Sequence, residues 1–382
     1  MDCKKAEFDL DPNVTFLNCA YMSPLLNTVE EAGIQGIKRK RRPHIIPPTD
    51  FFDETDILRK EYAKLVHCSE PNRLVVIPSA SYGMANVAKN VELKASDNII
   101  VAGEQFPSNV YPWMEIANKA QATIKTIAPP NTLDGRGKAW NEQILEAIDE
   151  HTRLVAMGNI HWADGTIFDM KAIRAKTTKV GALMAIDGTQ SIGAMPFNID
   201  EIKPDALVTA SYKSLMGPYS IGMAYYGPSL NHGSPIEQNW INRYESENFS
   251  NLVNYSDRYQ DGALRYEVGE HSNFILVPML IAAVKKLNEW GPENIQEYCR
   301  NLVEPSIQKL REAGYWIEET EYRASNLFGI RLGNQHDMEK IKAALTQANI
   351  LVSYRGDAIR VSPSIYNDEL DMAKLVSVLT SF

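Results

Sequence analysis

Residues 181–187 read GALMAID and residues 206–213 read ALVTASYK, and these two segments decide the fold. Each begins with a run that is apolar on both faces of a strand, as expected for strands of a parallel sheet covered by helices. Three other runs have the same character and alternate with amphipathic stretches: residues 74–77, 98–102 and 153–157. This alternation predicts an α/β fold with a mostly parallel sheet covered by helices.

Polar side chains follow three of these runs at the point where each expected strand ends. Asn159, Asp187 and Ser211 occupy these positions, and Lys213 lies two residues beyond Ser211. In open α/β sheets, ligands bind outside the carboxyl ends of the strands, so we expect these side chains to gather at one edge.

The pattern changes after about residue 260, where long amphipathic helices replace the short apolar runs. The expected helices cover residues 274–290, 293–313, 337–348 and 368–380, and the expected strands cover 326–332, 349–353 and 358–362. We therefore predict an N-terminal segment (1–20) near the active site and the small domain, a large domain (21–260) and a smaller α+β domain (261–382).

Charge and cysteine use exclude several classes of protein. The formal net charge of the 382-residue chain is −9, which argues against nucleic acid as a partner. The four cysteines are scattered, so neither a disulfide framework nor a zinc site is expected. No stretch reaches the roughly 20 apolar residues of a membrane span, and the first residues do not resemble a signal peptide. A soluble cytoplasmic protein that binds no membrane and no metal is predicted.

Lys213 and Asp187 have the chemistry that pyridoxal catalysis requires. A lysine at a strand end can form a Schiff base with a carbonyl cofactor, and a nearby carboxylate can keep a pyridine nitrogen protonated. Residues 78–86, PSASYGMAN, follow a strand and open a helix, where backbone N–H groups can bind phosphate. Taken separately, Asp187 also fits a turn residue, and residues 78–86 also fit a capped helix without a ligand.

Taken together, these features resemble class V of the pyridoxal 5′-phosphate (PLP) aminotransferases, a fold type I family that includes cysteine desulfurases, kynureninases and isopenicillin N epimerase. The resemblance runs from residues 16–21 through 187–190 to 359–367. It implies PLP as cofactor, a small amino acid as substrate, and a homodimer with shared active sites. Residues 239–243 and 265–273 resemble the elements that reach the partner's site.

The resemblance also implies roles for individual residues. Phe106 would stack on the pyridine ring, Gln190 would bond the ring hydroxyl, and Arg360 would bind the substrate α-carboxylate, with Arg355 as a competing candidate. The full set expected to bind the cofactor is Ser81, Tyr82, Phe106, Asn109, Asp187, Gln190, Ser211, Tyr212, Lys213 and Trp240, and Lys213 and Asp187 are the expected catalytic residues. Residues 106–109, 160–170 and 211–213 resemble kynureninase more than cysteine desulfurase.

Two features depart from the desulfurase pattern. Glu270 follows Gly269 where desulfurases commonly have a threonine, and residues 345–360 contain no cysteine to carry a persulfide. Cys19 is the one other thiol candidate, and it also fits a buried structural cysteine. Cysteine desulfurase activity is therefore disfavoured.

We predict a class V aminotransferase or a C–C/C–S lyase, in which an amino acid exchanges with Lys213 as the Schiff-base partner. An amino-acid epimerase of the same family is the alternative. Two readings from other classes are a catalytically silent binding module with this fold and a nucleotide-dependent oxidoreductase, although the chain has neither a GxGxxG nor a GxxxxGK[ST] fingerprint.

Overall fold

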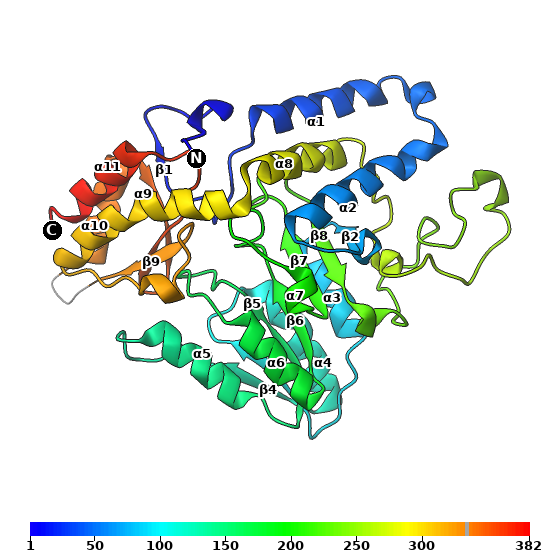
Figure 1. Cartoon of the computed structure of the whole chain (residues 1–382), viewed down its shortest axis with the longest axis horizontal. Coiled ribbons are helices and arrows are strands. Elements are labelled where there is room, and N and C mark those ends of the chain that lie inside the picture. The colour runs from blue at the N-terminus through cyan, green and yellow to red at the C-terminus, as the bar shows by residue number, and fades with distance from the viewer. Residues whose placement is uncertain (333–335) are drawn as a thin grey trace.

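A seven-stranded sheet forms the centre of the computed structural model, which describes residues 1–332 and 336–382 (Figure 1). The strand order is β2-β8-β7-β6-β5-β3-β4, and the strands from β7 to β4 run parallel. The strands are β2 (Leu74–Ile77), β3 (Asn98–Ala102), β4 (Thr123–Ile127), β5 (Thr152–Gly158), β6 (Leu183–Asp187), β7 (Ala206–Ala210) and β8 (Gly222–Tyr226). The predicted mostly parallel α/β sheet is confirmed.

The five apolar runs form strands within two residues of their predicted bounds, but the expectation for β2 was wrong in one respect. It lies at the end of the strand order and pairs with β8, which runs antiparallel to both β2 and β7. Short apolar runs do not reveal strand direction, because direction depends on which segment lies alongside. The strands β4 and β8 were not predicted. The sequence of β4, TIKTI, has no apolar run, since β4 lies at the sheet edge with its side chains half-buried or exposed.

Helices cover both faces of the sheet because alternate residues of each strand point to opposite faces. Val75, Ile99 and Val208 pack with α3 (Ala80–Lys89) and α4 (Tyr111–Ala120) on one face. Leu74, Ile100 and Leu207 belong to a second core on the other face. The helices that contribute to this second core include α1 (Asn27–Lys40), α2 (Asp53–Leu65), α5 (Arg136–Ala147), α6 (Met170–Val180), α7 (Ile199–Ile202) and α8 (Leu276–Trp290).

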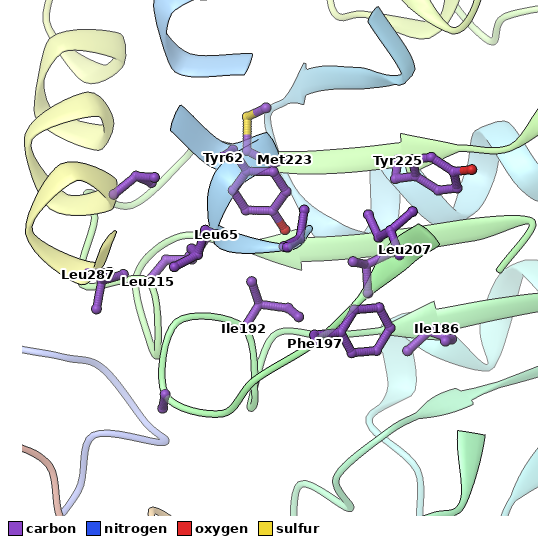
Figure 2. Packing of buried hydrophobic residues seen from close by; sticks show 14 of the residues in the cluster. Tyr62, Leu65, Ile186, Ile192, Phe197, Leu207, Leu215, Met223, Tyr225 and Leu287 are labelled. Atoms are coloured by element: carbon purple, nitrogen blue, oxygen red, sulfur yellow. The ribbon is translucent and has the colours of Figure 1, made fainter. Parts of the chain in front are cut away.

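The second core fixes the strands that carry the site. Figure 2 shows Leu207 and Ile186, from neighbouring strands, close to Phe197, with Tyr62 of α2 nearby. The Tyr62 hydroxyl donates a hydrogen bond to Thr209 Oγ1 at 3.0 Å, which ties α2 to β7. Burying each of these side chains stabilises the fold by about 1.5–3 kcal/mol. The end of β7, and with it Lys213, is therefore held in a rigid layer.

The C-terminal part forms a smaller layer with its own core. A three-stranded antiparallel sheet, β11-β12-β9, packs with α9, α10 and α11. These elements are β9 (Phe328–Arg331), β11 (Ser353–Arg355), β12 (Ala358–Val361), α9 (Pro292–Glu312), α10 (Met338–Gln347) and α11 (Glu369–Leu379). The four predicted helices and the predicted strands at 326–332 and 358–362 are confirmed. The predicted strand 349–353 is wrong in part: Ile350–Leu351 pairs outside this sheet, and only Ser353 belongs to a strand of it.

The N-terminus joins this smaller layer. The strand β1 (Thr15–Phe16) pairs in parallel with β10 (Ile350–Leu351), and Figure 1 shows β1 beside the C-terminal helices. The helix α8 contacts α1 and α2 rather than the C-terminal sheet. The boundary at residues 260 and 261 stays a prediction, and we propose that residues 1–20 act together with the small domain.

Candidate active site

A cavity of about 280 Å³ opens at the carboxyl ends of the central strands. Its lining comes from the loop after β3, the start of α3, and the residues that follow β5, β6 and β7. Six of the residues predicted from the sequence share this lining: Ser81, Phe106, Asp187, Gln190, Tyr212 and Lys213. The strand ends therefore gather as expected from the parallel sheet.

Lys213 lines this cavity and is the residue expected to form the Schiff base. It is 7% exposed, and its Nζ lies 5.3 Å from the centroid of the Phe106 ring and 5.4 Å from that of Tyr212. Burial lowers the pKa of Lys213 to about 8; Asp187 opposes this effect, and the charges of Arg360 and Arg355 add to it. A lysine with such a pKa is partly neutral near physiological pH and can act as a nucleophile.

Asp187 is the last residue of β6 and its carboxylate has a defined orientation. Its Oδ1 accepts a hydrogen bond from the backbone N–H of Thr189 at 3.0 Å. The hydroxyl oxygen of Thr189 in turn accepts a hydrogen bond from the N–H of Ala210 at 3.1 Å, which links the turn to β7. The two strand ends that carry Asp187 and Lys213 are thereby held side by side.

The first turn of α3 offers an anion site at the cavity. The Oγ of Ser79 caps the helix by accepting the N–H of Tyr82 at 3.2 Å, and it lies 2.9 Å from the Oγ of Ser81. The other first-turn N–H groups have no helical acceptor, and the helix dipole is positive there. Gly83 lets α3 approach the sheet, since a Cβ at this position would lie 2.7 Å from Val208.

Gln190 connects the cavity to the N-terminal segment. Its side-chain Nε2 donates to the backbone carbonyl oxygen of Ala20 at 3.2 Å, and its backbone carbonyl oxygen accepts a hydrogen bond from Asn326 Nδ2 at 3.2 Å. The predicted contact of Gln190 with a ring hydroxyl stays a prediction.

Four residues of the predicted set have side chains engaged elsewhere within this chain. The Tyr82 hydroxyl donates a hydrogen bond to Glu237 at 2.8 Å, and Asn109 Oδ1 accepts one from Trp113 Nε1 at 2.9 Å. The Ser211 hydroxyl donates to the carbonyl oxygen of Pro218. The ring of Trp240 packs edge-on against Phe51 and Phe249. None of the four is part of the cavity lining. Their cofactor contacts stay predictions.

Arg360 and Arg355 are not among the lining residues of the cavity but lie next to one of them, Trp162. Arg360 is 1% exposed and donates from Nη1 to the carbonyl oxygen of Trp162 at 3.0 Å and from Nη2 to Ser353 Oγ at 3.2 Å. Both guanidinium groups lie over the indole of Trp162, and Trp162 does line the cavity. Trp162 also contacts Phe106 edge-on, with ring centroids 5.4 Å apart.

Two lining residues were missed as functional candidates. Trp162 lies within residues 160–170 but was given no role of its own, and no role was predicted for Gln105. Gln105 donates to the carbonyl oxygen of Ala156 at 2.9 Å and accepts the N–H of Gly158 at 3.3 Å, so it anchors the loop that carries Phe106 to β5. The contacts of Gln105 join distant segments, so no local sequence pattern predicts them. The sequence offered one indication of a role for Gln105, namely its position next to Phe106.

A buried ion network supports the loop of Trp162. Asp164 Oδ1 lies 3.1 Å from His161 Nδ1, and Oδ2 accepts from Arg136 at 2.8 Å and from Arg331 at 3.0 Å. Burial by itself would raise the pKa of Asp164, but His161 and the two arginines outweigh burial and hold this pKa well below its usual range. Because Arg331 belongs to β9, the network joins the small sheet to the loop.

The thiols in the described part of the chain are free, and Cys19, Cys68 and Cys299 are buried. Burial raises the pKa of Cys19 to about 11, so this thiol is protonated at neutral pH. In the described ranges, no helix combines the length and the apolar character needed to cross a bilayer.

Comparisons with known proteins place these observations in context. A family model described as Aminotransferase class-V matches residues 49–376. The chain is 23% identical to the uncharacterised aminotransferase YcbU of Bacillus subtilis, covering 87% of this chain and 85% of the relative. It is 24% identical to a cysteine desulfurase of Pectobacterium atrosepticum, covering 67% of this chain and 61% of that enzyme.

Among solved structures, a variant of C-DES with glycine covalently linked to the PLP cofactor superposes with a TM-score of 0.87. The identity is 18%, and the superposition covers 99% of each chain. At this identity the likeness shows the fold, and that fold is type I.

Proposed function

Since the chain belongs to the aminotransferase class-V family, whose members are PLP-dependent enzymes, we propose that Lys213 binds PLP and that the site acts on a small amino acid. The reaction is proposed to be an aminotransfer or a C–C/C–S lyase reaction. One observation carries this proposal: a buried lysine with a lowered pKa lies within 5.4 Å of two aromatic ring centroids, next to a strand that ends in a carboxylate.

The residues around the cavity fit PLP. Lys213 can bond the aldehyde, Asp187 can hold the positive charge of the pyridine nitrogen, and Phe106 can face the ring. Ser79 and Ser81 at the positive end of α3 suit the phosphate. When bound, PLP supplies an electron sink that weakens the bonds at the substrate Cα.

Each of these residues has a task in the proposed reaction. Lys213, with its Nζ free and neutral, would remove the Cα proton of the substrate. Asp187 keeps the ring nitrogen protonated through its fixed carboxylate. Arg360 is proposed to orient the α-carboxylate, a role that suits a guanidinium group. The site to which Lys213 returns the proton separates aminotransfer from epimerisation, which remains the alternative reaction.

Several relatives are cysteine desulfurases, but this chain differs from the desulfurase pattern described above. Residues 345–360 contain no cysteine, and Cys19 is buried and protonated at neutral pH. We therefore propose a reaction that needs no persulfide-forming thiol. The kynureninase-like character of residues 106–109, 160–170 and 211–213 stays part of this proposal.

The decisive experiment is to mix the purified protein with PLP, record the visible spectrum, reduce with borohydride and map the labelled peptide. We expect a visible band and a label on Lys213. A protein that never takes up PLP would instead support the catalytically silent module.

The rate of covalent PLP uptake is expected to depend on pH through Lys213. Because its pKa is about 8, the neutral fraction of the amine rises about tenfold between pH 7 and pH 9 and then levels off. Stopped-flow absorbance with cofactor-free protein measures this rate. A simple amine with an unperturbed pKa, such as Nα-acetyl-lysine amide, should show a rise of about one hundredfold over the same range. Equal pH profiles for protein and free amine would contradict the prediction.

We also propose a homodimer with shared active sites. Tyr219 lines the cavity yet is 63% exposed, and its ring lies 4.6 Å from that of Tyr212. The chain between β8 and α8, which carries the exposed Trp240 and Tyr255, extends away from the sheet layers (Figure 1). A second copy would cover these aromatic side chains. Light scattering coupled to size exclusion tests the proposal, and a monomer mass would refute it.

A cytoplasmic location is proposed as well. The four cysteines in the described part of the chain are unpaired, and free buried thiols are typical of reducing compartments.

A further inference from the structure

Arg355 and Arg360 project from the same face of the small sheet. In the antiparallel pair of β11 and β12, Ser353 lies opposite Arg360 and Arg355 lies opposite Ala358. Opposite residues of an antiparallel pair share a face, and residues two apart on one strand share a face as well. Both arginines are therefore on the face that carries Ser353.

This face is turned toward the active-site cavity. The guanidinium carbon of Arg355 lies 5.1 Å from the centroid of the Trp162 ring, and that of Arg360 lies 5.7 Å from a Trp162 ring centroid. Trp162 lines the cavity together with Lys213. The charges of both arginines also act on Lys213, where they lower its pKa.

Neither arginine has a carboxylate partner among residues 1–332 and 336–382 within ion-pair distance, although this chain forms many such pairs elsewhere. The Nε atoms of both are buried without a hydrogen-bond acceptor. Burial, and then the charge of Arg355, lowers the pKa of Arg360 to about 9. Holding two like charges close together without a counter-ion is costly, so the arrangement favours binding of anions.

One anion is not enough to neutralise this pair. In the proposed function, the α-carboxylate of the substrate pairs with Arg360, while Asp187 serves the pyridine nitrogen. Arg355 donates a hydrogen bond to the carbonyl oxygen of Tyr354 at 2.7 Å, but it has no anionic partner among residues 1–332 and 336–382, and a neutral amino acid offers none. Resting on the proposed function, we infer that the substrate is an α-amino acid whose side chain ends in an anionic group, and that Arg355 binds this group.

The test compares acidic amino acids with their neutral isosteres on the PLP-loaded protein: aspartate with asparagine, and glutamate with glutamine. The spectral change on addition of each amino acid gives kcat/KM or an apparent Kd. At least one acidic member should be preferred about tenfold or more, in line with a hydrogen bond to a charged group. Arg355→Leu should lower this acid-to-amide ratio about 10- to 100-fold, and Arg355→Lys should retain part of it.

Lys342→Met is the matched control. Lys342 lies over the ring of Tyr354, which projects from the opposite face of β11, so this change removes a nearby cation without touching the proposed site. The acid-to-amide ratio should stay as in the wild type. A similar fall in Lys342→Met would show that net charge, not Arg355, sets the preference.

A second measurement needs no turnover. Succinate should raise the thermal midpoint of the cofactor-free protein more than butyrate, which has the same chain length and one carboxylate, and Arg355→Leu should remove the difference. The inference is overturned if the wild-type protein shows an acid-to-amide ratio near one, or if Arg355→Leu weakens the response to the acid and to its amide equally. This holds even if Lys213 is labelled after borohydride reduction. Failure to label Lys213 would instead overturn the proposed function.

Discussion

Lys213→Ala is expected to abolish covalent PLP attachment and to lower turnover by at least about 10³-fold, because one side chain provides both the cofactor bond and the proton transfer at Cα. Borohydride reduction should leave no label on the variant protein. Noncovalent PLP can still occupy the cavity, since Asp187, Phe106 and the start of α3 remain. The measurements are peptide mapping after reduction and steady-state rates with an amino-acid panel.

Asp187→Asn serves as the graded control for this prediction. It preserves the shape of the side chain and removes the charge, so the label on Lys213 should persist while turnover falls by about 10²- to 10³-fold. A wild-type spectrum and rate in Lys213→Ala would show that another amine holds the cofactor.

Asp164→Ala is expected to destabilise the fold by about 3–5 kcal/mol, because it leaves Arg136 and Arg331 buried without their shared carboxylate. Asp164 is 3% exposed, so solvent screens its ion pairs little. Urea unfolding followed by circular dichroism measures the change. If the variant does not fold, Asp164→Asn, which keeps the shape of the side chain, provides a milder test of the same charge.

Asp357→Ala is the matched control, since Asp357 also pairs with Arg331 but its side chain is 75% exposed. Exposed pairs contribute about 0–1 kcal/mol, so this variant should unfold close to the wild type. Equal effects of the two substitutions would contradict the view that burial gives Asp164 its importance.

Loss of the Asp164 network should also reach the active site. The network holds the segment that carries Trp162, and the carbonyl oxygen of Trp162 accepts a hydrogen bond from Arg360. A folded Asp164→Asn protein should therefore bind amino acids more weakly while still forming the bond to Lys213. Substrate binding and cofactor attachment should separate in this variant because the Asp164 network holds the loop of Trp162, whereas Lys213 follows β7.

Local patterns in the sequence determined the class of fold and the centre of the candidate site. Runs such as ALVTA can be read directly as buried strands, because both of their faces are apolar. Asp187 and Lys213 were identifiable because polar residues at or just beyond the end of such a strand lie at the edge of the sheet. The helices after residue 260 could also be predicted locally, because the apolar face of a helix repeats every three to four residues along the sequence.

Contacts between distant segments decided the rest. The antiparallel direction of β8, the edge position of β4 and the anchoring of Phe106 by Gln105 depend on which strands lie alongside one another. The sequence named Arg355 and Arg360 as competitors for one task, whereas the register of β11 and β12 places both on one face over Trp162. Burial and charge at Lys213 come from residues far apart in the chain, and only tertiary packing brings them within electrostatic reach.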